Sequence, residues 1–185
     1  MQRIFFLIVL FISCSMNGQS SLKQYLNSPI KYTKQKITDN KGNYSIYAPN
    51  NWIFSENSSD SYLLFWHSIF KEKDNKTIAE MEIAKIKDNK DLKTIFNSYL
   101  NPEIPIKILA SGESDLLIYP SYFLHSVSYL DKNSKENNNI ERIKFFIKSK
   151  QNKTFYIIRL SVKGEKQKEN MSKMLQCLKT FEILK

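Results

Sequence analysis

Residues 140–148 read Ile-Glu-Arg-Ile-Lys-Phe-Phe-Ile-Lys. Apolar Ile143, Phe145 and Ile147 alternate there with charged side chains, which is the two-residue period of a strand that buries one face. A second apolar segment, 154–162, follows after the short polar connection 151–153, so the two segments are expected to pair as antiparallel neighbours. This stretch therefore predicts an antiparallel sheet.

Further strands are expected on both sides of this pair, at 32–37, 44–48, 62–66, 77–86, 106–113 and 121–131. The sequence Asp-Asn-Lys-Gly at 39–42 is expected to close a hairpin, with Gly42 at the position of positive φ. Segment 62–66 is apolar on both faces, and a strand of that kind belongs in the middle of a sheet that is covered on both sides.

Two segments change to the helical period of 3.6 residues. In 91–100, apolar residues recur on one helix face after Asp91, which is suited to begin a helix. The segment from about Glu165 to Phe181 has Lys173 on its expected solvent-exposed face. Its expected buried stripe consists of Met171, Met174, Leu175, Leu178 and Phe181. Together the periods predict an α+β fold, with an antiparallel sheet of about seven strands flanked by helices on both faces as an α-β-α sandwich.

The N-terminus is typical of an export signal. Arg3 precedes the unbroken apolar run 4–12, which is too short to span a membrane. Residues 10–14, Leu-Phe-Ile-Ser-Cys, resemble a bacterial lipobox, so Cys14 is the predicted site of lipidation. Ordinary cleavage after Gly18 is the alternative. Residues 1–18 are thus assigned to the signal peptide, 19–30 to a polar tether and 31–185 to one globular domain.

This assignment predicts an exported protein of the cell envelope that is held by its lipid at a membrane, with the outer membrane favoured and a soluble periplasmic or secreted protein as the alternative. After processing, the domain keeps only Cys177, which lies in a helical apolar pattern and is expected to be a buried, unreactive thiol.

The net charge of +10 comes almost entirely from lysine, and the only arginines are Arg3, Arg142 and Arg159. Bidentate phosphate and base contacts favour arginine. We therefore expect a solvated basic surface and no nucleic-acid partner.

Groups that could carry catalysis are sparse. The only histidines, His67 and His125, each precede a serine, but adjacent strand residues point to opposite faces and cannot pair directly. Two carboxylate pairs, Glu80 with Glu82 and Glu113 with Asp115, are expected on solvated strand faces. Because the sequence has no glycine-rich phosphate loop and no CxxC motif, we predict no catalytic residue, metal site or cofactor.

The segment 44–52, Tyr-Ser-Ile-Tyr-Ala-Pro-Asn-Asn-Trp, resembles the early signature of PsbP-like domains. Ser111-Gly112-Glu113 and the C-terminal Phe181-Glu182-Ile183 follow the same order. The resemblance covers about 30–185 and implies an α-β-α sandwich that acts as a binding or assembly factor. It carries no functional residue over, since such residues differ between branches of the family.

Three hypotheses follow. The first is a non-enzymatic envelope protein that binds or assembles a membrane-associated protein partner. The second is a small-ligand carrier whose ligand-binding residues are unknown, with a pocket lined by Trp52, Tyr62, Trp66 and Tyr119. The third is a hydrolase that uses His67 or His125, which requires an accessible histidine in a cleft beside a carboxylate.

Overall fold

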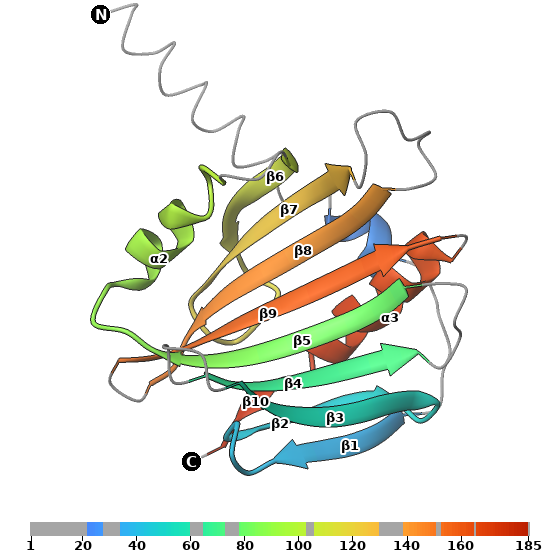
Figure 1. Ribbon diagram of the computed structural model, residues 1–185, viewed down its shortest axis with the longest axis horizontal. Coiled ribbons are helices and arrows are strands. Elements are labelled where there is room, and N and C mark those ends of the chain that lie inside the picture. The colour runs from blue at the N-terminus through green and yellow to red at the C-terminus, as the bar shows by residue number, and fades with distance from the viewer. Residues whose placement is uncertain are drawn as a thin grey trace, which may run out of the picture.

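The computed structural model describes residues 22–27, 34–59, 65–72, 78–102, 106–129, 139–150, 153–164 and 166–184, of which 56–59, 65–72 and 129 are described by their backbone alone. The predicted signal peptide and Cys14 lie outside these residues. Two helices and ten strands are labelled in Figure 1. Their bounds are β1 Lys34–Asp39, β2 Tyr44–Pro49, β3 Trp52–Ser59, β4 Phe65–Glu72, β5 Ile78–Lys87, α2 Leu92–Ser98, β6 Ile106–Ser114, β7 Ser121–Tyr129, β8 Asn139–Lys148, β9 Thr154–Lys163, α3 Gln167–Leu178 and β10 Glu182–Ile183.

The main sheet has seven strands in the order β3-β4-β5-β9-β8-β7-β6, and every neighbouring pair is antiparallel. The predicted pairing of 140–148 with 154–162 is the β8–β9 pair, which lies near the middle of this sheet. The meander from β6 to β9 brings β9 against β5, so the two halves of the chain meet along that pair. The predicted antiparallel sheet of about seven strands is confirmed.

The first hairpin does not join this sheet. β1 and β2 form a separate three-stranded sheet with the two-residue β10. One face of β2 is buried, because Tyr44, Ile46 and Ala48 pack into the core with α3, whereas Tyr47 on the other face is 41% exposed. The alternation of apolar and polar residues within the hairpin does not by itself indicate that the hairpin belongs to a second sheet.

Glycine at the turn of this hairpin has a different role from the one expected. Positive φ occurs at Asn43, 60°, and not at Gly42. Gly42 N–H donates to Asp39 Oδ1 at 2.6 Å. A Cβ atom on Gly42 would lie 2.6 Å from a Tyr44 ring carbon and 2.7 Å from Asp39 Oδ2. Glycine is therefore required at position 42, because any side chain there would collide with Tyr44 and Asp39.

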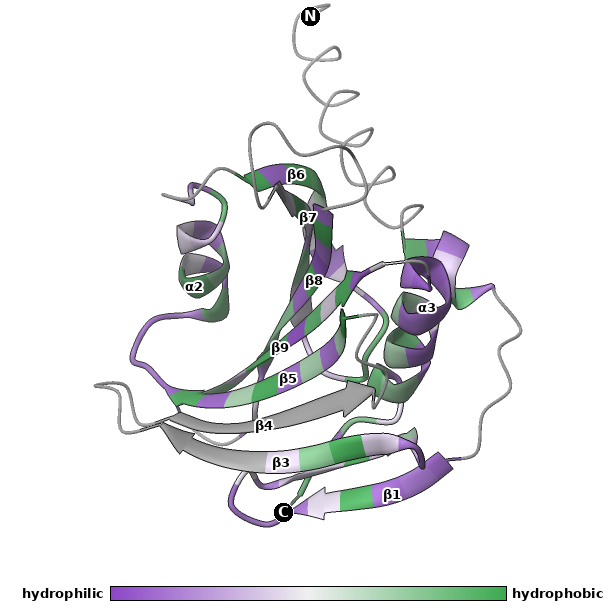
Figure 2. Cartoon of the chain, turned by 45° about the vertical axis from the view of Figure 1, so that its right-hand side comes forward, coloured by the Kyte–Doolittle hydropathy of each residue, from purple (hydrophilic) through white to green (hydrophobic). Residues whose placement is uncertain are grey.

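The two helices cover opposite faces of the curved main sheet (Figure 2). Every residue of the stripe predicted for α3 is buried, including Phe181, which follows the end of the helix. Lys173 differs from its expectation, because its side chain is only 14% exposed and its Nζ lies 2.6 Å from Glu169 Oε1. On the other face, Asp91 begins α2 as predicted, and its Oδ1 accepts a hydrogen bond from Thr94 N at 2.8 Å.

The predicted tether 19–30 is wrong for part of its length. Residues 22–26 form a short helix, called helix 22–26 below, and its Leu22 and Tyr25 are only 5% and 7% exposed. Both belong to the core beneath α3, so this helix is part of the globular unit. Cys177 is buried in the same core, as predicted. Within the described residues, no helix combines the length and the hydropathy of a membrane span.

Candidate functional site

A group of five charged side chains lies on the sheet face that carries α2. Side chains alternate along β8, so Ile143 and Phe145 face the core under α3 while Arg142 and Lys144 face the other side. In the register of the sheet, Lys144 is opposite Arg159 and Arg159 is opposite Glu82. We call the group of Glu80, Glu82, Arg142, Lys144 and Arg159 the charged sheet face.

Arg159 forms ion pairs with the two carboxylates of this surface. Its Nη2 lies 3.6 Å from Glu80 Oε1 and also forms an ion pair with Glu82 Oε2. The guanidinium side chain is 39% exposed, while the side chains of Glu80 and Glu82 are 20% and 19% exposed. The pair of strand glutamates is therefore neutralised in part by one arginine, and the two do not flank a cleft as a glycosidase pair would.

The other two cations have no ion-pair partner among the described side chains. Arg142 Nη1 donates to the hydroxyl of Ser128, and Lys144 Nζ lies 4.6 Å from the centroid of the Tyr99 ring. Burial lowers the pKa of Arg142, as does the positive charge of Arg159. Burial also lowers the pKa of Lys144, together with the charges of Arg159 and Arg142. Glu80 attracts Arg142 and Glu82 attracts Lys144, but burial and the neighbouring positive charges outweigh these attractions.

Helix α2 forms one border of this surface. Phe146, on the same strand face as Lys144, is buried beneath α2 together with Leu124 and Phe155. The ring of Phe146 lies 5.6 Å from Phe96 and 4.9 Å from Tyr99, centroid to centroid. These apolar contacts hold α2 over one end of the charged sheet face, so the cations lie at the margin of the helix.

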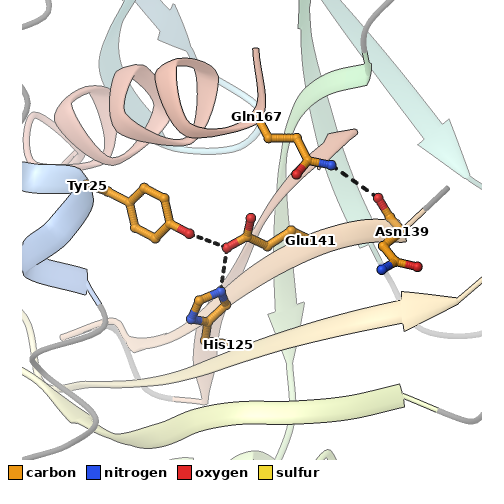
Figure 3. A network of polar contacts seen from close by, with 5 residues as sticks. All are labelled: Tyr25, His125, Asn139, Glu141 and Gln167. Atoms are coloured by element: carbon orange, nitrogen blue, oxygen red, sulfur yellow. Dashed lines mark hydrogen bonds and ion pairs between the residues drawn. The ribbon is translucent and has the colours of Figure 1, made fainter. Parts of the chain in front are cut away.

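The opposite face contains a buried polar network (Figure 3). His125 is 2% exposed, and its Nε2 lies 2.7 Å from Glu141 Oε1. Tyr25 of helix 22–26 donates its phenol proton to the same oxygen. Nδ1 of His125 is buried and has no hydrogen-bond partner among the described residues. Beside them, Gln167 Nε2 donates to the carbonyl oxygen of Asn139 at 3.3 Å.

The network shifts the pKa values of Glu141 and Tyr25 in opposite directions. Burial alone would raise the pKa of Glu141, but the hydrogen bonds from His125 and Tyr25 outweigh it and lower that pKa overall. Burial raises the pKa of Tyr25 well above its ordinary value, and the Glu141 carboxylate raises it further. Glu141 is therefore an anion and Tyr25 a neutral donor at neutral pH.

This arrangement argues against the hydrolase hypothesis for His125. The histidine does lie beside a carboxylate, but it is covered by helix 22–26 rather than accessible in a cleft. Its neighbour Ser126 belongs to the opposite sheet face, as the alternation predicts. The side chain of His67 lies outside the described residues.

The other predicted candidates do not gather into a site. Trp52 is 4% exposed, and both Trp52 and Tyr119 pack with the core rather than around a pocket. The side chains of Tyr62 and Trp66 lie outside the described residues. Exposed Glu113 accepts a hydrogen bond from Tyr122 at 3.5 Å, and Asp115 is exposed. In the part of the chain that the structure describes, no group of three His, Cys, Asp or Glu side chains could hold a metal ion.

The charged sheet face was not predicted from the sequence, because the arginines are far apart along the chain and form no local cluster. Arg142 and Arg159 are distant in sequence but lie close together in space, since the β8–β9 hairpin places Lys144 opposite Arg159. The alternation of 140–148 already placed Arg142 and Lys144 on one face. Joining that face to the register of the next strand would have brought the three cations together, but not the two glutamates of β5.

No protein-family model and no curated protein sequence matches this chain. Several solved structures resemble its fold. Cyanobacterial PsbP (CyanoP) from Synechocystis sp. PCC 6803 is 13% identical, with a TM-score of 0.54 over 85% of this chain and 96% of that one. The Saccharomyces cerevisiae Ran-binding protein Mog1p is 11% identical, with a TM-score of 0.55 over 83% and 97%. LpqN, involved in cell envelope biogenesis of Mycobacterium tuberculosis, is 9% identical, with a TM-score of 0.52 over 85% and 100%.

At these identities the likeness concerns the backbone arrangement alone. The three structures share with this chain the antiparallel sheet between helices that the segment 44–52 and the order of elements predicted. The chain has a PsbP-like fold.

Proposed function

We propose that this protein is an exported, non-enzymatic binding or assembly factor of the cell envelope, held at a membrane by a lipid on Cys14. In this proposal the charged sheet face recognises an acidic segment of a membrane-associated protein partner. The fold neighbours support a binding role by analogy, since Mog1p binds Ran and LpqN is involved in envelope biogenesis.

One observation carries the choice of surface. Arg142 and Lys144 are half-buried cations with no carboxylate at ion-pair distance among the described residues. The attraction of Arg142 to Glu80 and of Lys144 to Glu82 does not outweigh burial and the repulsion from Arg159, so the pKa of each cation is lowered overall. Taking charge out of water without pairing it is unfavourable. A partner carboxylate placed between these two side chains would remove that cost, and its contact with Arg142 could be bidentate.

The surface is tested by neutralising the two cations. The variant Arg142→Gln/Lys144→Gln removes both charges and keeps polar side chains that can form hydrogen bonds. Its matched control is Lys166→Gln/Lys168→Gln, which removes the same charge from exposed positions at the start of α3. Each chain is isolated in detergent from its native membrane, and the stoichiometry of co-purifying protein is measured.

We expect a stoichiometric partner with the wild-type chain and with the control, and its loss with the Arg142 and Lys144 variant. The recovered partner should contain an acidic segment that cross-links to the β8 surface. Equal recovery with both variants, at unchanged melting temperature, would contradict the assigned surface.

The lipid anchor is tested separately at Cys14. Replacing Cys14 with alanine should move the protein from the membrane fraction to the soluble fraction and remove the acyl mass from the intact chain. An unmodified wild-type chain that begins at Gln19 would reject the anchor and leave a soluble exported protein with the same fold.

A further inference from the structure

A hollow of about 270 Å³ opens where β5 and β8 end and β9 begins, beside the start of α2. Three segments line it: the loop 88–91 that follows β5, residues 148–150 at the end of β8, and residues 153–155 at the start of β9. Its lysines are Lys90, Lys148, Lys150 and Lys153, and we call it the lysine hollow.

Backbone hydrogen bonds hold the walls of the lysine hollow together. Asp88 N–H donates to the carbonyl oxygen of Lys153 at 3.0 Å, which joins the loop to β9. Ser149 N–H donates to the carbonyl oxygen of Thr154 at 3.1 Å, which joins the ends of β8 and β9. Phe155, 3% exposed, anchors this end in the core under α2. The shape of the hollow is therefore formed without a ligand, which lowers the entropy cost of binding.

The charges in the hollow are unbalanced. Four lysines and two aspartates line it, and both carboxylates already accept hydrogen bonds from neighbouring residues of the chain. Asp91 accepts from Thr94 N at 2.8 Å and from Thr94 Oγ1 at 2.9 Å, and Asp88 Oδ1 accepts from Lys90 N at 2.9 Å. Among the described residues, none of the four lysines forms an ion pair. The lining thus carries an excess of positive charge, and a concave surface concentrates its field, so this hollow attracts anions.

The backbone at Lys153 gives a separate indication. Its φ is 61°, in the left-handed region, where a side chain with a Cβ atom costs on the order of 1 kcal/mol. Among the residues that the structure describes, the other non-glycine residue with positive φ is Asn43, at 60°, and asparagine tolerates this conformation. At position 153, in the short connection between β8 and β9, the chain instead has a lysine, and this lysine is one of the residues that line the hollow. Asparagine or glycine would cost less at this turn position.

We propose that the lysine hollow binds the phosphate group of a small phosphorylated molecule or of a phospholipid headgroup. Several compact ammonium charges around one concave surface suit a multiply charged phosphate, for which lysine acts as a point charge. The volume is near the lower limit of ligand pockets and suits one or two phosphate groups with a small organic part. This site uses none of the residues of the charged sheet face, and it does not depend on the anchor at Cys14.

The experiment measures binding to the purified full-length chain by isothermal titration. One arm uses pyrophosphate as the soluble probe, and the other uses phosphatidylcholine vesicles that contain phosphatidic acid. The variant Lys148→Gln/Lys150→Gln is compared with Lys166→Gln/Lys168→Gln, so that both chains lose two positive charges. We expect saturable binding that weakens at least about tenfold in the first variant and less than about twofold in the second.

A third variant separates binding from folding. Lys153→Asn removes one charge from the hollow and places a residue that tolerates positive φ, so binding should weaken while the melting temperature stays the same or rises. Binding in the pyrophosphate arm identifies a soluble phosphate ligand, and binding in the vesicle arm alone identifies a lipid headgroup. The proposal is overturned by no saturable binding in either arm, or by equal weakening in the two double variants, which would reflect net charge alone.

Discussion

The variant Tyr25→Phe, which removes only the hydroxyl group, tests whether the hydrogen bond to Glu141 holds helix 22–26 on the domain. The ring is 7% exposed and would keep its packing in Tyr25→Phe. The variant loses only the hydrogen bond to Glu141, a partly buried charged acceptor. A hydrogen bond to a charged group contributes about 1.5–3 kcal/mol, and Glu141 keeps its contact with His125. We therefore expect a loss of about 1.5 kcal/mol in the free energy of unfolding.

Tyr25→Ala removes the buried ring as well and should cost about 3–5 kcal/mol. Equilibrium unfolding in urea measures both variants, and hydrogen exchange at 22–26 reports whether the loss is local to the helix. A double-mutant cycle with Glu141→Gln isolates the Tyr25–Glu141 pair. If Tyr25→Phe matches the wild type in both stability and exchange, the hydrogen bond does not fasten this helix.

The effect of Tyr25→Phe should depend on pH. The pKa of Glu141 is lowered from its ordinary value of 4.5, so its contribution is present above that value and is lost as the pH falls through the lowered one. The pKa of Tyr25 is raised above its ordinary value of 10.0, so its contribution is complete below pH 10.0 and is lost as the pH rises further. The difference between wild type and Tyr25→Phe should thus be constant from about pH 5 to 9 and shrink in acid. A difference that persists in acid below the lowered pKa of Glu141, measured on protein that is still folded by circular dichroism, would show that the Glu141 charge is not involved.

Three other substitutions test the packing and the two turns by thermal and urea unfolding. Leu175→Ala should lose about 2–5 kcal/mol because it leaves a cavity under α3, whereas exposed Lys168→Ala should lose less than about 0.5 kcal/mol; equal losses would mean that the buried face of α3 is misassigned. Lys153→Gly should gain about 1 kcal/mol by relieving the left-handed backbone, and a loss would show that the lysine side chain stabilises the turn. Gly42→Ala should lose about 1–3 kcal/mol because its Cβ meets the ring of Tyr44, and an unchanged melting temperature would contradict that close approach.

The sequence predicted best where one face of an element is buried. Ile143, Phe145 and Ile147 alternate with charges, so both the strand and its inward face followed from the pattern. The buried stripe of α3 was predicted equally well from its helical period. The sheet to which β1 and β2 belong was not predictable this way, since β10 supplies only two residues and its pairing with Tyr44 and Ser45 is set by tertiary packing.

Helix 22–26 was missed because polar residues surround it. Leu22, Tyr25 and Leu26 nevertheless recur at i, i+3 and i+4, which is the signal that could have identified a short amphipathic helix. The charged sheet face needed more than a local pattern. Arg159 meets Glu80 and Glu82 only because β9 pairs with β5, and a pairing between strands this distant in sequence has no local signature.

If Cys14 is acylated as proposed, the docking of helix 22–26 would limit how far the domain could move from a membrane. Seven residues, 15–21, separate Cys14 from this helix, and a segment of that length reaches at most about 25 Å when fully extended. The domain would then stay in a thin layer over the bilayer, where its effective concentration toward a membrane partner would reach the millimolar range. Even weak contacts would suffice for occupancy. Detaching Tyr25 would lengthen the connection to the anchor and lower that concentration without altering either charged surface.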